Sequence, residues 1–155
     1  AIAPTPTPVP PTPTPTPTPD AKPYYDKGVE YIEAEDWAMA IEELDKAIDL
    51  DPNYAAAYDG RGWSYRGLGD HNAAIADYNK AIQFDPDLVK AYSHRGVSYR
   101  ALGHNQLAID DYDKAIQLDP NYVNVHNINF LIPIYLNLGR KVPQALDNQH
   151  IHVGI

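Results

Sequence analysis

The sequence repeats itself every 34 residues, and this period restricts the fold more than any other feature. Three segments end alike: DKAIDLDP from Asp45, NKAIQFDP from Asn79 and DKAIQLDP from Asp113. Their starts also match, since KGVEYIEAED from Lys27 aligns with RGWSYRGLGD and RGVSYRALGH one and two periods later. One such unit is too short to bury a core alone, so successive units must stack in a row and bury their apolar faces against each other.

The middle repeat, residues 55–88, predicts two helices that lie antiparallel. On each helix tyrosine and a small residue, glycine or alanine, occupy positions i, i+4 and i+7, which places three residues on one face. Gly62 on the first helix should let the second helix approach closely. Gly69 suits the end of the first helix, and Pro86 ends the second because the residue before a proline disfavours helical backbone. The recurring residues are Tyr58, Gly62 and Tyr65 on the first helix and Ala74, Tyr78 and Ala81 on the second.

Over about residues 21–122 the recurring positions resemble those of the tetratricopeptide repeat (TPR) family. The resemblance implies an all-α fold, a right-handed solenoid of antiparallel helix pairs. Two departures are mild: tyrosine replaces the usual tryptophan, and Lys27, Arg61 and Arg95 replace the usual leucine. The matching positions are Tyr24, Gly28, Tyr31, Ala40, Leu44, Ala47 and Pro52 in the first repeat, and Tyr92, Gly96, Tyr99, Ala108, Tyr112, Ala115 and Pro120 in the third.

The chain divides into an arm, three repeats and a decayed end. The end resembles a fourth repeat in which Pro133 interrupts a helix and apolar side chains cover more than one face. This apolar surface, continued by the alternating tail IHVGI, favours contact with another subunit. We predict the units 1–20 (Pro/Thr-rich extended arm), 21–54, 55–88 and 89–122 (three TPR units), 123–148 (degenerate fourth repeat or capping helices) and 149–155 (C-terminal tail). The predicted subunit contacts are Phe130, Leu131, Ile134, Tyr135, Ile151, Val153 and Ile155.

The first 19 residues, AIAPTPTPVPPTPTPTPTP, can form neither helix nor sheet because nearly every second residue is proline. This arm should extend near polyproline II. Alternating Thr-Pro is typical of stalks on exported and often O-glycosylated proteins, so we expect a secreted, extracellular or cell-surface protein. The start at Ala1 fits either removal of a signal peptide or a cloning boundary. The predicted O-glycosylation positions are Thr5, Thr7, Thr12, Thr14, Thr16 and Thr18.

Composition and motifs argue against catalysis and against several kinds of partner. A formal net charge of −9 disfavours nucleic acid and anionic lipid, and no apolar run is long enough to span a bilayer. The absence of cysteine excludes disulfides and thiolate chemistry. The six histidines form no recognised ligand motif, and the carboxylates recur at equivalent positions, as structural residues do. We therefore predict no enzyme activity, no cofactor, no metal and a protein partner.

The TPR resemblance implies that partners bind in a concave groove lined by the first helix of each repeat. Family members that grip a C-terminal carboxylate use a lysine–asparagine clamp, which Tyr25, Val29 and Trp63 do not match. The groove presents aromatic and apolar surface flanked by two arginines, which suits a proline-rich segment. For Trp63 the sequence leaves two interpretations open, the groove and the core. The predicted groove residues are Tyr25, Val29, Ile32, Asp59, Trp63, Arg66, Ser93, Val97 and Arg100.

Two functions fit these features, and both are scaffolds. In the first, which the sequence favours, the chain assembles with other copies of itself. The Pro-Thr arm docks on a neighbouring copy, and the repeats stack head to tail into a filament or tube. In the second, a secreted or tethered adaptor binds a proline-rich or helical peptide of another protein in its groove. Deleting the arm distinguishes the two, because only self-assembly needs it; a fragment of a larger enzyme is a third, weaker hypothesis.

Overall fold

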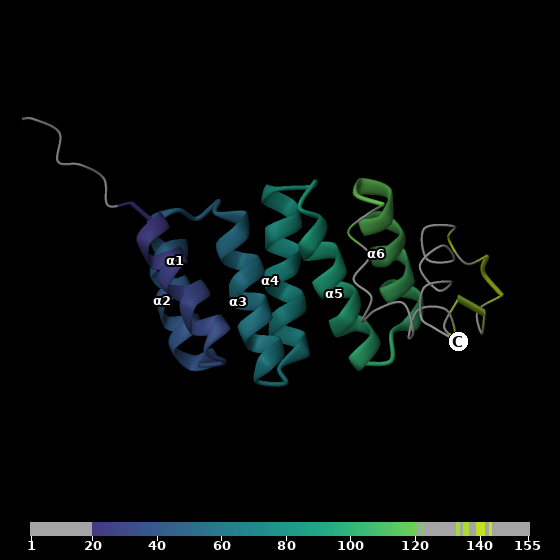
Figure 1. Ribbon diagram of the computed structural model, residues 1–155, viewed down its shortest axis with the longest axis horizontal. Coiled ribbons are helices and arrows are strands. Elements are labelled where there is room, and N and C mark those ends of the chain that lie inside the picture. The colour runs from purple at the N-terminus through teal and green to yellow at the C-terminus, as the bar shows by residue number, and fades with distance from the viewer. Residues whose placement is uncertain are drawn as a thin grey trace, which may run out of the picture.

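The part of the chain that the structure describes is built from helices, and no strand occurs in it (Figure 1). Residues 1–19 of the predicted arm and the predicted C-terminal tail, 149–155, lie outside the described residues, as does most of the predicted fourth unit, 123–148. The computed structural model describes residues 20–120, 122, 133, 135, 136, 139–141 and 143. The helices are α1 (Lys22–Glu33), α2 (Trp37–Leu50), α3 (Ala55–Gly67), α4 (His71–Phe84), α5 (Val89–Ala101) and α6 (Asn105–Leu118).

The helices pack in pairs, α1 with α2, α3 with α4 and α5 with α6. Each pair also packs on the next, through α2 against α3 and α4 against α5, so the pairs follow one another in a single row (Figure 1). The first helices of the pairs contact one another as well, α1 with α3 and α3 with α5. We call the layer formed by α1, α3 and α5 the first-helix face. The predicted all-α solenoid of helix pairs is confirmed.

Small residues let the two helices of a pair approach closely, as the middle repeat shows. Ala74 and Ala81 of α4 are fully buried, and so is the ring of Tyr78. Gly62 of α3 faces that ring. A Cβ at Gly62 would lie 2.7 Å from Cε1 of Tyr78 and 3.1 Å from the carbonyl oxygen of Ala74. The close approach predicted at Gly62 is therefore confirmed, because a larger side chain would displace its neighbours.

The turn inside each repeat requires a left-handed residue shortly after the first helix. Gly69 has φ +82° and Gly103 has φ +80°, in the turns after α3 and α5. The first repeat places Glu35 at the equivalent position with φ 57°. The predicted role of Gly69 at the end of the first helix is confirmed, since glycine adopts this conformation without steric cost.

An aspartate caps the N-terminus of α2 and of α4, but not of α6. The carboxylates of Asp36 and Asp70 accept the backbone N–H three residues further on, at 3.3 and 2.9 Å. His104 holds the equivalent position before α6, and its side chain makes no capping bond. We expect His104→Asp to raise the free energy of unfolding by about 1 kcal/mol, because it supplies the missing cap. Urea unfolding measures the change against His104→Ala as control, and an unchanged midpoint for His104→Asp would contradict it.

Each first helix carries a cation at the same position of the repeat, and this cation bonds an acid on the second helix of its own pair. Arg61 makes two bonds of 2.7 Å to Asp77, one from Nε and one from Nη2. The side chain of Arg61 is 20% exposed and that of Asp77 is 8% exposed, so the pair is largely shielded from water. The repeated pairs are Lys27–Glu43, Arg61–Asp77 and Arg95–Asp111.

The two arginines also reach back to the preceding repeat. Nη1 of Arg61 donates to Asp45 at 2.5 Å, and Nη1 of Arg95 donates to Asn79 at 2.6 Å. We call the bonds of Arg61 and Arg95 to their acceptors in both repeats the arginine ladder. Each arginine thus ties the second helix of its own pair to the second helix of the pair before it. This gives the repeated position of Asp45 the structural role expected from the sequence.

Tyr135 lies in the core of its own chain. Its side chain is 1% exposed and packs with Ala108, Ile109 and Tyr112 of α6. Its hydroxyl donates to Asp113. Contrary to the sequence prediction, this side chain is not available to a neighbouring copy, because it already covers the last described helix pair. The other predicted subunit contacts lie outside the described residues: Phe130, Leu131, Ile134, Ile151, Val153 and Ile155.

Candidate functional site

A pocket of about 400 Å³ opens on the first-helix face. Part of its lining comes from the N-terminal halves of the first helices, and part from the turns that follow the second helices. Because α1, α3 and α5 pack side by side, the pocket draws residues from all three repeats. Its lining consists of Tyr25, Ala56, Asp59, Asp85, Asp87, Leu88, Val89, Lys90, Asp119 and Tyr122.

Acidic side chains dominate the charged lining of this pocket. The lining contains four aspartates, Asp59, Asp85, Asp87 and Asp119, and a single lysine, Lys90. Asp85 ends α4, and its Oδ1 accepts the backbone N–H of Asp87 at 3.1 Å, which fixes the turn between α4 and α5. The side chain of Asp87 is exposed. Carboxylates that converge from several elements give the pocket a negative potential.

Two tyrosines supply neutral aromatic surface to the same pocket. The ring of Tyr25 packs against Tyr54, with ring centroids 5.0 Å apart. Burial raises the pKa of Tyr25 and of Tyr122 above the ordinary value for tyrosine. Both phenols therefore stay uncharged near neutral pH. Aromatic surface beside carboxylates suits a side chain that combines an apolar stem with a cationic head.

Trp63 lies one helical turn from the pocket and is half-buried between α3 and α5. The guanidinium carbon of Arg66 stands 3.8 Å from the centroid of the indole ring. The ring of His94 meets the indole edge-on, with centroids 4.5 Å apart. Nδ1 of His94 lies 2.9 Å from Oδ1 of Asp59, which connects this cluster to the pocket. Four predicted groove residues are thus brought together: Tyr25, Asp59, Trp63 and Arg66.

The other predicted groove residues are partly used in internal packing. Ile32 packs against the core of the first repeats, and Val97 packs against the core that contains Tyr135. Ser93 is buried, 6% exposed. Val29 and Arg100 are half-buried on α1 and α5. The first-helix face therefore offers a narrower set of accessible residues than the repeat pattern indicated.

Sequence reasoning missed most of the pocket lining, including Asp87, Lys90 and Tyr122, and it missed His94 beside Trp63. Asp85 and Asp119 each precede a proline, and the sequence predicted only that such a proline ends the second helix of its repeat. The recurrence of Asp-Pro turns was the available signal, since stacked repeats bring equivalent turns to the same edge. For His94 the sequence held no comparable signal, because the other repeats have no histidine at its position.

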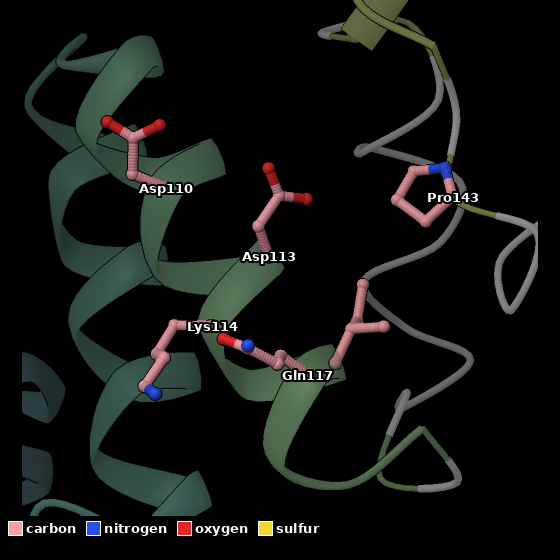
Figure 2. A pocket seen from close by; sticks show the side chains of 6 residues that line it. Asp110, Asp113, Lys114, Gln117 and Pro143 are labelled. Carbon is pink, nitrogen blue, oxygen red and sulfur yellow. The ribbon is translucent and has the colours of Figure 1, made fainter.

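A second pocket, of about 540 Å³, lies between α6 and Pro143 (Figure 2). Asp110 and Asp113 project from α6 on this side (Figure 2). Nη1 of Arg140 lies 3.1 Å from Asp110 and 3.3 Å from Asp113, and Asp113 also accepts the hydroxyl of Tyr135. These carboxylates are bonded to the C-terminal segment of the same chain, so the pocket marks an internal contact.

Neither a metal site nor a membrane span is found in the described part of the chain. Among the described residues, no three His, Cys, Asp or Glu side chains gather as metal ligands would. The helices that the structure describes include none with the length and apolar character needed to cross a bilayer.

Comparison with known proteins agrees with the helical repeats. Family models described as "Tetratricopeptide repeat" match residues 21–54 and 89–122, and one described as "TPR repeat" matches residues 62–103. No curated protein sequence matches the chain. The fold and the site define a helical-repeat scaffold for protein–protein interaction. The chain belongs to the tetratricopeptide repeat family.

Solved TPR domains resemble the structure along most of its length. The first TPR of Spaghetti (RPAP3) bound to the HSP90 peptide SRMEEVD has a TM-score of 0.71 and 30% identity, covering 77% of this chain and 94% of that chain. The first TPR domain of human RPAP3 has a TM-score of 0.70 and 30% identity, covering 77% and 92%. The TPR2B domain of yeast Sti1 in its pHsp70 complex has a TM-score of 0.66 and 26% identity, covering 83% and 97%.

Proposed function

We propose that the chain is a non-catalytic adaptor that binds a segment of a partner protein across its first-helix face. The observation that carries this proposal is the continuity between the pocket and the Trp63 cluster through the contact of Asp59 with His94. A bound segment that fills the pocket would have the indole of Trp63 one helical turn beyond Asp59 on α3. The peptide complexes of the Spaghetti (RPAP3) and yeast Sti1 domains support this mode of binding.

Trp63 is the residue best suited to anchor such a segment. Its ring is rigid, half-buried and held between Arg66 and His94, so little conformational entropy is lost when a ligand packs on it. Tryptophan and arginine are also the residue types that contribute most often to binding energy at protein interfaces.

Trp63→Ala should weaken peptide binding by about tenfold or more, because truncation of an interface anchor costs at least about 1.4 kcal/mol. Peptides selected from a random phage-displayed library on the full chain provide ligands even though the natural partner is unidentified. Their affinities are then measured by calorimetry for the native chain, Trp63→Ala and Trp37→Phe. Trp37 packs against Gly67, away from the pocket lining, and serves as the control. Equal affinity for Trp63→Ala and the native chain would place binding elsewhere.

Self-assembly through the Pro-Thr arm is the second candidate function, and the aromatic surface of Tyr25, Trp63 and Tyr122 favours it. Such surface accommodates polyproline II. The arm carries neither lysine nor arginine to match the acidic pocket, however, and we therefore place this function second. Its Thr-Pro composition is also the basis on which we propose a secreted or surface location. Analytical ultracentrifugation of the chain with and without residues 1–19 tests assembly, since an arm-dependent polymer must dissociate when the arm is removed.

A further inference from the structure

We propose that the pocket on the first-helix face selects a basic segment and holds one of its lysine or arginine side chains. This inference rests on the proposed function and specifies its partner chemistry. It commits to a positively charged segment of a partner protein as the occupant.

The charge of the pocket is the first argument. Asp59 comes from α3, Asp87 from the turn before α5, and Asp119 from the turn after α6, so three elements contribute an acid to one lining. The carboxylate of Asp59 also lies 2.9 Å from Nδ1 of His94. Lys90 is the single cation in that lining, and it is exposed. A concave surface lined by one sign of charge focuses its field and attracts a ligand of the opposite sign.

The walls of the pocket are the second argument. Tyr25 and Tyr122 add aromatic surface to the same lining as the carboxylates, and the volume of about 400 Å³ admits a long side chain. The methylene stem of lysine or arginine packs on such rings while its charged head meets the acids. A cation over a tyrosine face gains further electrostatic attraction. A small inorganic cation would use the carboxylates but not the rings.

The charge of known TPR ligands gives the contrast. The HSP90 peptide SRMEEVD, bound by the TPR of Spaghetti (RPAP3), carries two glutamates and a terminal aspartate. The pocket described here would repel such a sequence, since like charges that face each other in an interface cost several kcal/mol by a rough estimate. The two domains therefore share a fold but differ in the sign of the charge they prefer.

Nuclear magnetic resonance titration of the ¹⁵N-labelled full chain tests the inference. The probes are SRMEEVD and its charge-inverted counterpart SRMKKVK with an amidated C-terminus. We expect SRMKKVK-amide to shift the amides around Asp59, Asp87 and Tyr122 saturably, with an affinity about tenfold or more above that of SRMEEVD. Raising the salt from about 0.05 to about 0.5 M should weaken it, because screening shortens the range of the attraction.

Two double variants remove the same amount of charge from different places. Asp59→Asn with Asp87→Asn should weaken binding of SRMKKVK-amide by about tenfold, since both changes lie in the pocket. Glu35→Gln with Asp49→Asn removes two exposed acids outside the pocket lining and should leave the affinity within about twofold. The amide spectra themselves report whether each variant is folded.

The inference is overturned if SRMEEVD binds the pocket as well as SRMKKVK-amide does, or if SRMKKVK-amide gives no saturable shifts there. It is also overturned if both double variants lose the same affinity, which would mean attraction to the net charge alone. Selected neutral or acidic peptides that still depend on Trp63 would then leave the proposed adaptor function standing. Loss of all Trp63-dependent binding would remove the adaptor function itself.

Discussion

Arg61→Leu should lower the free energy of unfolding by about 3 kcal/mol, although leucine is the usual residue at this position of a TPR unit. The change leaves Asp77, whose side chain is 8% exposed, without its partner. The two hydrogen bonds from Arg61 to Asp77 are lost together with the one to Asp45 in the preceding repeat. The hydrogen bond with Asp77 also raises the pKa of Arg61. The guanidinium is therefore charged at the pH of the unfolding experiment. Urea unfolding followed by circular dichroism measures the loss.

A second variant separates the unpaired acid from the other effects of the substitution. Arg61→Leu combined with Asp77→Ala should recover most of the lost stability, to within about 1 kcal/mol of the native chain, because no buried charge remains. Lys22→Ala is the matched control for an exposed pair. Lys22 and Asp26 are 65% and 51% exposed, and we expect a change below about 0.5 kcal/mol. A double variant no more stable than Arg61→Leu alone would contradict this account of the arginine ladder.

Gly62→Ala should destabilise the chain by about 2 kcal/mol, although alanine normally favours a helix over glycine. The added methyl group would sit 2.7 Å from Cε1 of Tyr78, which is fully buried, and 3.1 Å from the backbone oxygen of Ala74. A buried ring and a backbone group can move away from the added methyl group much less easily than the end of a flexible side chain can. Overpacking of this kind forces α3 away from α4, and thermal unfolding of the variant measures its cost.

The control for this substitution lies two residues earlier on the same helix. A Cβ at Gly60 would meet Cδ1 of Leu44 at 3.4 Å, an ordinary contact distance. Gly60→Ala should therefore raise the free energy of unfolding by about 0.5 kcal/mol through helix propensity. Opposite signs for the two alanine substitutions are the expected result. If Gly62→Ala also stabilised the chain, packing between the paired helices would have to be looser than the structure indicates.

The helix pairs and their turns followed from the sequence because each depends on local residues at a fixed spacing. The period of 34 residues predicted the pairs, Gly62 predicted the close approach of α3 and α4, and Gly69 predicted the end of α3. Each of these features repeats along the chain, so two or three copies support the same inference. Glu35 shows the limit of the pattern, since it takes a left-handed conformation that its residue type does not indicate.

The candidate site was harder to predict because its residues meet only after the repeats stack. Asp85 and Asp119 belong to different turns, and their distance from Tyr25 depends on how far each helix pair is rotated relative to the one before. That rotation is a property of the packed core and has no local sequence signature. The prediction that Tyr135 contacts another subunit was wrong for a related reason. An apolar side chain in a decayed repeat can pack on the core of its own chain or on a partner, and the residue pattern is the same in both cases.

The arginine ladder has a consequence for how chains of this kind change in length. Asp45 and Asn79 show that the acceptor in the preceding repeat can be an acid or an amide. A tandem duplication of residues 55–88 would therefore present a second arginine to Asn79, in the same arrangement that Arg95 uses now. The copied unit brings its own buried acid and its own acceptor for the next unit. The arginine ladder itself would therefore need no compensating substitution when a whole repeat is added by duplication.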